Sequence, residues 1–229
     1  MNTIQGLVFD AYGTLLDVYS IGRLAEQLYP GSGAALGNLW RDKQIEYSRL
    51  VSLSDPQPQG SRHYASFWAL TEAALRYSLE RLQLDGRDTL VQQLMNQYAR
   101  LDAFPECQAV LRTLSKADLP MAVLSNGSPD MLQSALDHAG LSPHMHHLIS
   151  VDGVRQFKTH PAAYALACST LNLPKENLLF VSSNGWDVMG AGWFGFSTCW
   201  INRAGLPFET IGPRPTLMGQ DLSVVLSAI

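Results

Sequence analysis

Four sets of polar side chains in this sequence have the types and the spacing that chemistry in one cleft would need. They are residues 10–14, residues 125–127, Lys158 and residues 182–187. A carboxylate such as Asp10 can act as a nucleophile, a lysine can keep it charged, and hydroxyl and amide groups can bind an anion. Each set alone has a plainer interpretation as a turn, a helix cap or a solvated charge. Their position after successive apolar runs favours a shared catalytic site.

The apolar runs that precede these residues are typical of buried strands. Strands are expected at residues 6–9, 121–125, 147–151, 178–183 and 198–202. Segments with helical spacing lie between them and begin behind Pro105, Ser128-Pro129 and Pro161. Alternating strands and helices predict an α/β fold with a parallel sheet, whose chemistry lies at the carboxyl ends of its strands.

Residues 17–104 differ from the rest because they show helical spacing without a convincing strand. We therefore expect a helical bundle inserted after the first strand, with a loop at residues 52–60. The three apolar stripes that indicate this bundle are Leu36, Leu39, Trp40, Lys43, Tyr47 and Leu50; Tyr64, Phe67, Trp68, Thr71, Leu75 and Leu82; and Leu90, Leu94, Tyr98 and Leu101.

Composition narrows the class of partner. The chain has 229 residues, 46% of them apolar and 16% charged, with a formal net charge of −4, which gives no basis for binding nucleic acid or an acidic membrane. Residues 1–6 lack a secretion signal, and no apolar run reaches the ~18 residues of a membrane span. Cys107, Cys168 and Cys199 are too far apart for a disulfide framework or a zinc cluster. We expect a cytoplasmic protein with reduced thiols.

Two further patterns match known motifs by their letters but not by their position. Residues 190–195 spell G-x-G-x-x-G, yet a dinucleotide-binding motif opens a helix directly after a strand, and these glycines come late in an expected helix. We expect them to allow close helix packing and a helix end. His144, His146 and His147 have no further ligands at metal-binding spacing, so a solvated loop is favoured.

The motifs themselves resemble those of a known family. Residues 9–15 (F-D-A-Y-G-T-L), 124–128 (L-S-N-G-S), Lys158 and 180–187 (F-V-S-S-N-G-W-D) resemble the four motifs of the haloacid dehalogenase superfamily. Residues 39–47, 67–77 and 199–205 are similar to the L-specific 2-haloacid dehalogenases, and the resemblance covers nearly the whole chain. It implies a Rossmann-like doubly wound parallel sheet as the core, residues 1–16 and 105–229, with an inserted helical-bundle cap subdomain, residues 17–104.

Tyr12 separates this chain from the phosphatases of the same superfamily. Those enzymes carry a second Asp two positions after the nucleophile, and it protonates the departing alkoxide. A halide leaves as a stable anion without a proton, so breaking a carbon–halide bond needs no acid at Tyr12. The last motif also offers a single carboxylate, Asp187, where magnesium would need more oxygen ligands. We therefore expect neither a metal nor a cofactor.

The resemblance implies that Asp10 displaces the halide and forms an ester, which water then cleaves at the Asp10 carbonyl. Lys158 would pair with Asp10, where a cation at ~4 Å contributes about 4 kcal/mol at an effective dielectric near 20. Asp187 would orient or deprotonate the water. The other implied members of this polar network are Thr14, Tyr164, Ser182 and Asn184.

The resemblance also implies which residues bind the substrate and the halide. Arg41, in the inserted helices, would reach over the cleft and receive the halide together with Asn126 and Trp186. The groups expected to hold the substrate carboxylate are Ser125 and the backbone amides near Ala11 and Tyr12.

An apolar wall would complete the implied pocket. Phe67 fits this wall and the ordinary core equally well, whereas Trp40 and Trp68 are expected in the core. The implied wall residues are Tyr12, Ile45, Phe67 and Trp186.

Two positions depart from the family pattern. Relatives often have Pro directly after the motif lysine, whereas here Thr159 and His160 come before Pro161, which leaves the loop of Lys158 less restrained. Many relatives carry Gln where this chain has Asp42, and a carboxylate there could weaken halide capture or repel the substrate anion.

The implied activity is hydrolysis of short L-2-haloalkanoates, such as chloroacetate or L-2-chloropropionate, to 2-hydroxyacids of D configuration. Family members are typically homodimers, which implies a homodimer here. Two alternatives stay open: a magnesium-dependent phosphatase or phosphonatase of the superfamily, and a non-catalytic relative that binds a small acid or a protein.

Overall fold

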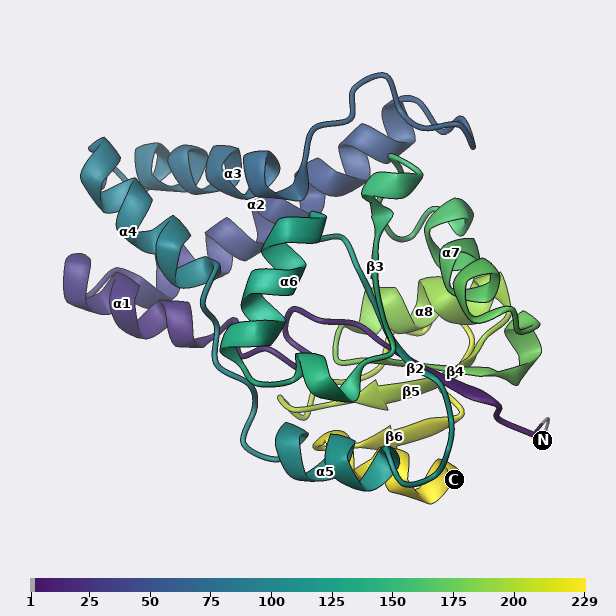
Figure 1. Ribbon diagram of the computed structural model, residues 1–229. Coiled ribbons are helices and arrows are strands. Elements are labelled where there is room, and N and C mark those ends of the chain that lie inside the picture. Colours follow the sequence, from purple (N-terminus) through teal and green to yellow (C-terminus); the bar gives the residue numbers. More distant parts are fainter. Residues whose placement is uncertain (1–2) are drawn as a thin grey trace.

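The computed structural model describes residues 3–229, and over this range six strands form a single sheet (Figure 1). The strands run in the order β3-β2-β1-β4-β5-β6, and every neighbouring pair is parallel. Their bounds are β1 (Gly6–Phe9), β2 (Met121–Ser125), β3 (His147–Ser150), β4 (Leu178–Ser182), β5 (Ser197–Ile201) and β6 (Leu217–Gly219).

Helices cover both faces of this sheet. In Figure 1, α5 and the 3₁₀ helix Leu222–Ala228 lie below the strands, while α7 and α8 lie above them. The bounds are α5 (Cys107–Leu114), α6 (Pro129–His138), α7 (Pro161–Leu171) and α8 (Gly185–Phe194). A parallel sheet covered on both faces is the doubly wound α/β fold, so the expected fold class is confirmed.

The central strands explain where the cleft lies. Every residue of β1, β2 and β4 is buried, as expected of strands covered on both faces. Strand β1 lies between β2 and β4, so the chain winds outward from it in both directions. In such sheets the crevice forms at the carboxyl ends of the strands beside this switch point. The sequence did not predict β6, whose three residues are too few to show a periodicity.

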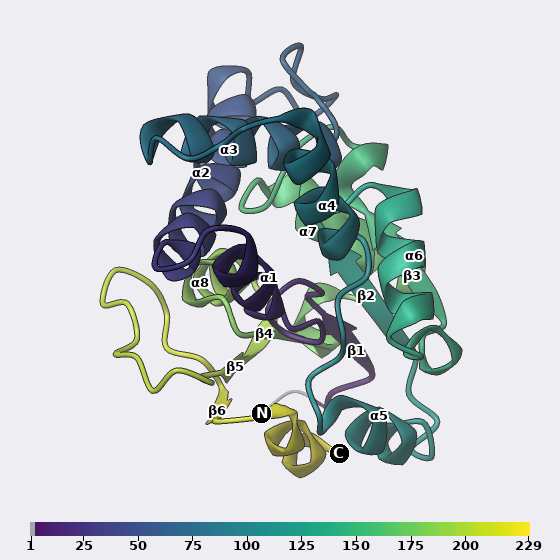
Figure 2. The ribbon, with the colours of Figure 1, turned by 90° about the vertical axis from the view of Figure 1, so that its left-hand side faces the viewer.

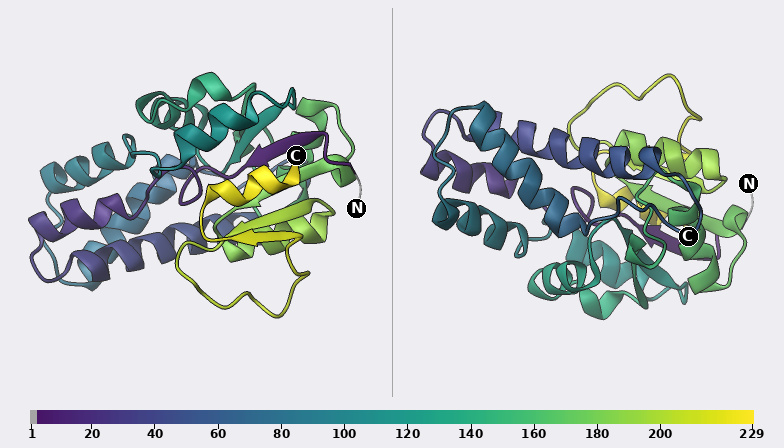
Figure 3. Two further views of the ribbon diagram at one scale, coloured as in Figure 1. Left: turned by 90° about the horizontal axis from the view of Figure 1, so that it is seen from below. Right: turned by 90° about the horizontal axis from the view of Figure 1, so that it is seen from above.

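Four helices lie between β1 and α5, and they pack on one another beyond the carboxyl ends of the strands (Figure 2). Figure 3 shows them extending away from one end of the sheet. Their bounds are α1 (Ser20–Leu28), α2 (Gly33–Ser54), α3 (Phe67–Arg81) and α4 (Asp88–Tyr98). The division into a core and a cap stays a prediction. Residues 1–2, which belong to the predicted core and to the segment predicted to lack a secretion signal, lie outside the described range. None of the helices within residues 3–229 combines the length and the apolar character needed to cross a membrane.

Helix α2 buries only part of the face that was expected. Lys43 and Tyr47 of the predicted stripe are half-buried and Leu50 is exposed, whereas Gln44 is buried. Gln44 tolerates burial because its amide donates a hydrogen bond of 2.6 Å to Thr71 Oγ1 on α3. The stripe was correct at Leu36 and Trp40, which are buried, and wrong in its second half, because hydropathy alone ignores a polar side chain that finds a partner.

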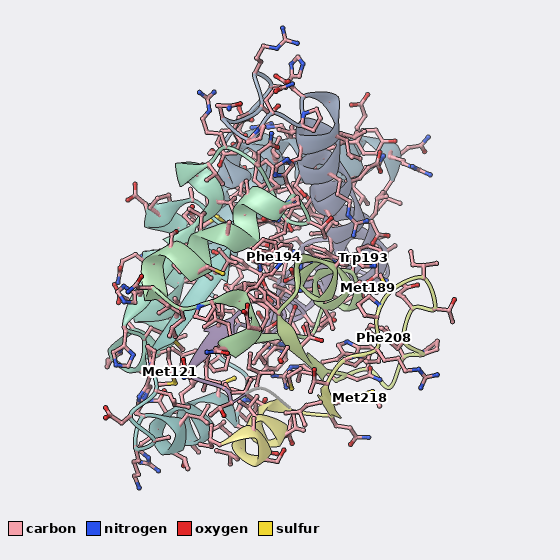
Figure 4. The ribbon with its side chains drawn as sticks, turned by 90° about the vertical axis from the view of Figure 1, so that its right-hand side faces the viewer. Met121, Met189, Trp193, Phe194, Phe208 and Met218 are labelled. Atoms are coloured by element: carbon pink, nitrogen blue, oxygen red, sulfur yellow. The ribbon has the colours of Figure 1, made fainter. Side chains whose placement is uncertain are left out.

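The loop between β5 and β6 is held against α8. Figure 4 shows Met189 and Trp193 on α8 and Phe208 on this loop, on the same side of the molecule. The Trp200 and Phe208 ring centroids are 5.0 Å apart. A Cβ atom at Gly212 would lie 2.7 Å from Met189 Cγ, so the loop backbone packs directly on the helix.

Gly190 allows α8 to pack closely on its neighbours, as expected of the glycine-rich part of this helix. A Cβ atom there would lie 2.5 Å from Thr159 Cγ2 and 2.6 Å from the Tyr164 hydroxyl. We expect Gly190→Ala to lower the free energy of unfolding by about 1–3 kcal/mol, because α8 must move away from α7 and the lysine loop. Urea denaturation measures this change.

The matched control for Gly190 is Gly22→Ala in α1, where an added Cβ meets no atom within 4 Å. There we expect a gain of up to about 1 kcal/mol, because alanine reduces the entropy of the unfolded chain. Equal effects at the two positions would contradict the packing role of Gly190.

Candidate active site

Three charged side chains meet at the carboxyl ends of the central strands. Lys158 Nζ lies 3.0 Å from Asp10 Oδ1 and 2.9 Å from Asp187 Oδ2. All three residues are buried. Asp10 directly follows β1, Asp187 lies in the first turn of α8, and Lys158 lies in the loop before α7. The fold thus brings together residues that are far apart in the sequence.

The single ammonium group compensates two carboxylates. Burial alone would lower the pKa of Lys158, but Asp10 and Asp187 raise it overall. Burial raises the pKa of Asp187 to about 6, and Lys158 opposes this rise. Lys158 therefore stays charged, while Asp187 ionises in the range where a general base is effective.

The second oxygen of Asp10 is held by hydrogen bonds. Asp10 Oδ2 accepts from Thr14 Oγ1 at 2.9 Å and from Asn184 Nδ2 at 2.9 Å, and Ser182 Oγ lies 3.5 Å from it. Thr14 Oγ1 in turn accepts from the Ser183 backbone N–H at 2.9 Å. These contacts fix the direction in which the carboxylate points.

Asp187 is fixed in a similar way. Its Oδ1 accepts from the Tyr164 hydroxyl at 2.8 Å, and its Oδ2 accepts from Ser182 Oγ at 3.2 Å. Burial, followed by the charge of Asp187, raises the pKa of Tyr164 well above its usual value, so the phenol remains a donor. Ser182 contacts both carboxylates and links the two halves of the network.

The loop of Lys158 is more firmly held than its sequence suggests. The Phe157 backbone N–H donates to Ser52 Oγ at 2.8 Å, and Gln156 Nε2 donates to the Asp55 and Gln57 carbonyl oxygens, each at 2.8 Å. These partners belong to the end of α2 and the segment after it. Ser52 lies inside α2, so the loop expected at residues 52–60 begins only after Ser54. Sequence reasoning missed Ser52 and Gln156, because only the folded chain places them side by side.

Arg41 reaches from α2 across the cleft, as the resemblance implied. Its Nη2 lies 3.4 Å from the Tyr12 carbonyl oxygen and 3.3 Å from Asn184 Oδ1. A cavity of about 510 Å³ opens beside it, and its lining includes Ile45 and Trp186. The guanidinium therefore bridges the loop after β1 and the residue that precedes α8, and it stands in the cavity wall.

Arg41 makes a further contact that was not predicted from the sequence. Arg41 Nη1 donates to Gln44 Oε1 at 2.7 Å, and the Tyr98 hydroxyl donates to the same oxygen at 3.1 Å. Gln44 lies one helical turn after Arg41, a spacing that could have indicated the contact. Tyr98 carries no such signal, because α4 is distant in the sequence.

Tyr12 and Phe67 lie in an aromatic cluster. The Tyr12 ring stacks on Tyr98 with centroids 5.5 Å apart, and Phe67 lies 6.3 Å from Tyr12 and 6.0 Å from Phe157. The Tyr12 hydroxyl is buried and has no hydrogen-bond partner among the described residues. Burial raises the pKa of Tyr12 well above its usual value, so it stays neutral. Trp40 is a core residue, as expected, and donates to the Thr71 carbonyl oxygen.

Ser125 and Asn126 stabilise the loops of the site. Ser125 Oγ accepts from the Gly127 backbone N–H at 3.0 Å, and Asn126 Oδ1 accepts from the Lys158 backbone N–H at 2.9 Å. Asn126 thus helps to position the lysine. Carboxylate binding by Ser125 with Ala11, and halide binding by Asn126, stay predictions.

The donor set does not fit the magnesium ion of the superfamily phosphatases. Magnesium requires about six oxygen ligands in octahedral geometry. Here the ammonium of Lys158 lies between the carboxylates of Asp10 and Asp187, and Tyr12 stands where a further carboxylate would be needed. Within residues 3–229, no three His, Cys, Asp or Glu side chains gather in a metal-binding arrangement.

Comparison with known proteins places this geometry in a family. The model of the haloacid dehalogenase-like hydrolases matches residues 4–195. The (S)-2-haloacid dehalogenase H-109 of Pseudomonas putida is 44% identical over 222 residues, which cover 97% of this chain and 96% of that protein.

Solved structures agree with this match. The L-2-haloacid dehalogenase RSc1362 superposes with a TM-score of 0.95 at 50% identity, covering 99% of this chain and 98% of that chain. The L-2-haloacid dehalogenase of Xanthobacter autotrophicus, with chloropropionic acid covalently bound, superposes with a TM-score of 0.87 at 36% identity, covering 97% of each chain. By its fold and its sequence, this chain belongs to the (S)-2-haloacid dehalogenase family of the haloacid dehalogenase-like hydrolases.

Proposed function

We propose that this protein hydrolyses short L-2-haloalkanoates to D-2-hydroxyalkanoates and halide. The observation that carries the proposal is the Asp10 carboxylate, which is buried, held by Lys158 and two further donors, and has Tyr12 where a phosphatase has its acid. The family relatives named for this activity support it.

In the first step, Asp10 attacks the 2-carbon of the substrate from the side opposite the halogen. A carbon–oxygen bond forms, the carbon–halogen bond breaks, and the halide leaves with the bonding pair of electrons. The configuration at carbon inverts once. The covalently bound chloropropionic acid in the Xanthobacter autotrophicus relative supports an ester of this kind.

In the second step, water adds to the carbonyl carbon of the Asp10 ester. Asp187 accepts a proton from the water, the bond between the aspartyl carbon and the substrate oxygen breaks, and the 2-hydroxyacid departs with a proton. The Asp10 carboxylate is regenerated, and the sum of both steps is haloacid plus water giving hydroxyacid, halide and one proton. Tyr164 and Ser182 orient Asp187 for this step.

Arg41 is assigned to the leaving halide. Its guanidinium stands in the wall of the cavity that also contains Trp186, and a fixed planar cation gains most as charge develops on the leaving atom. Ser125 and the amides near Ala11 and Tyr12 are assigned to the substrate carboxylate. Ile45, Phe67 and Trp186 are assigned to the apolar wall.

A single turnover in ¹⁸O-labelled water with excess enzyme tests the mechanism. The hydroxyl oxygen of the product comes from Asp10, so the label is expected in the Asp10 side chain and not in the first product molecule. Label that enters the first product directly, with Asp10 unlabelled, would show that water attacks the 2-carbon and that no ester forms.

We expect kcat for L-2-chloropropionate to increase as the pH rises through about 6 and to level off above it. Asp187 must lose its proton before it can activate water, and burial raises its pKa to about 6. Halide release measured between about pH 4.5 and 9 gives this profile. A rate that stays constant across the whole range would contradict the assignment of Asp187 as the base.

Three further assignments belong to this proposal. Residues 17–104 act as a cap subdomain over a core formed by residues 1–16 and 105–229, a division supported by the contact of Arg41 with Asn184. The protein is cytoplasmic, in keeping with its three cysteines, which are all unpaired within residues 3–229. It forms a homodimer, for which the exposed Leu50 and Leu53 of α2 offer an apolar contact, and sedimentation measures this state.

A further inference from the structure

A second arginine on α2 lines the same cavity as Arg41. Arg49 comes eight residues later, about two turns and ~12 Å along the helix, so both side chains project from one face. The cavity of about 510 Å³ lies between this face of α2, the loop that carries Gly13, and the start of α8 with Asn184 and Trp186. The proposed mechanism uses Arg41 for the halide and leaves Arg49 without a function.

The guanidinium of Arg49 lacks an acidic partner. Its Cζ lies 5.0 Å from the centroid of the Trp186 ring, and the side chain is half-buried. Within residues 3–229, no carboxylate oxygen lies within 4.0 Å of its nitrogens. Burial lowers the pKa of Arg49, and the ionised carboxylate of Asp187 opposes this shift.

The two carboxylates that line the cavity do not pair with Arg49. Asp42 and Glu46 also line the cavity. Glu46 pairs with Lys43 at 2.8 Å, and exposed Asp42 lies beside Arg41, about two turns away from Arg49. Within residues 3–229, neither carboxylate forms an ion pair with Arg49, so its guanidinium remains available for an anionic ligand.

A half-buried guanidinium on an aromatic face is suited to a carboxylate ligand. The planar group offers a pair of N–H donors to both carboxylate oxygens, and the Trp186 ring lies beside it. The 2-carboxylate of the substrate is already assigned to Ser125 and the amides near Ala11 and Tyr12. A ligand for Arg49 must therefore carry a second anionic group, farther from the reacting carbon.

We propose that Arg49 and Trp186 form an anion-binding subsite at the entrance of the catalytic cleft, which selects 2-haloacids that carry a second carboxylate. The inference rests on the proposed dehalogenase function and names its substrate class, 2-halodicarboxylates such as (S)-2-chlorosuccinate. The bonds that form and break are those of the monocarboxylate reaction, and the second carboxylate only binds. (S)-2-chlorosuccinate would give D-malate, chloride and a proton.

The test compares two substrates that differ mainly in the second carboxylate, (S)-2-chlorosuccinate and (S)-2-chlorobutanoate. We expect Arg49→Met to lower kcat/KM for chlorosuccinate about 10- to 100-fold and to change that for chlorobutanoate less than about threefold. Arg49→Lys retains the charge and should recover part of the loss. Arg112→Met, on α5 at the far side of the sheet, removes the same charge and should change neither value.

Binding of the unreactive acids separates this inference from the proposed function. Calorimetry should show that succinate binds more tightly than butanoate, and that Arg49→Met removes the difference. If no halide is released from any haloacid while this difference persists, the proposed function is wrong and the subsite stands. An equal loss on both chloro substrates, or no loss on chlorosuccinate, overturns the subsite even if dehalogenation is observed.

Discussion

Replacing Asp10 with asparagine is expected to reduce kcat for L-2-chloropropionate by at least about 10⁴-fold. The amide is a far weaker nucleophile than the carboxylate, so the ester with the 2-carbon no longer forms. Lys158 keeps its contact with Asp187 in this variant, at 2.9 Å in the parent chain, and the network does not collapse. Halide release at saturating substrate measures the loss.

The matched control for Asp10→Asn is Asp118→Asn, which removes the same charge at an exposed position. Asp118 has a positive φ of 52°, a conformation that asparagine also adopts readily. The control should retain the parent activity, and both variants should unfold at nearly the parent urea concentration. An Asp10→Asn enzyme with kcat within tenfold of the parent would show that another group attacks the substrate.

Lys158→Met is expected to lose both activity and stability. The substitution leaves Asp10 and Asp187 buried close to each other without a cation, and breaking a buried ion pair in this way costs about 3–5 kcal/mol. One carboxylate will then take up a proton at neutral pH, and kcat will fall by at least about 10³-fold. Urea unfolding and halide release measure the two effects.

A double-variant cycle separates the two consequences. Asp187→Asn removes one of the uncompensated charges, so Lys158→Met combined with Asp187→Asn should be more stable than Lys158→Met alone. Activity should not return, because the base is also lost. If the double variant is less stable than the single one by the full additive amount, Lys158 does not act by compensating these carboxylates.

The sequence was sufficient to predict β1 to β5, but not β6, because the central strands are short, apolar and covered on both faces. The loops that follow these apolar strands carry polar residues, and the carboxyl ends of parallel strands meet at one edge of the sheet. Asp10 and Lys158 could therefore be assigned to one cleft. The contact of Lys158 with Asp187 was not predicted, because a spacing of 29 residues carries no distance information. It follows only from the fold, which places the loop before α7 over the start of α8.

Helix α2 shows why periodicity fails where polar groups are buried. The predicted stripe followed hydropathy and included Lys43, while the structure buries Gln44, which has partners on α3 and α4. Hydropathy likewise gave no reason to single out Arg49. This residue stands out only in the structure, where its guanidinium has no carboxylate partner within residues 3–229. Both cases depend on contacts between segments that the sequence leaves far apart.

The course of α2 also constrains how the length of this chain can vary. Arg41, at the cleft, and Ser52, which holds the lysine loop, are separated by about three whole turns and therefore share one face. Inserting or deleting one residue between them would rotate one end against the other by about 100°. Either the arginine or the serine would then face away from the sheet. Insertions and deletions that preserve activity should therefore fall in the loops that flank this helix. The helix fixes the distance and the relative orientation of Arg41 and Ser52.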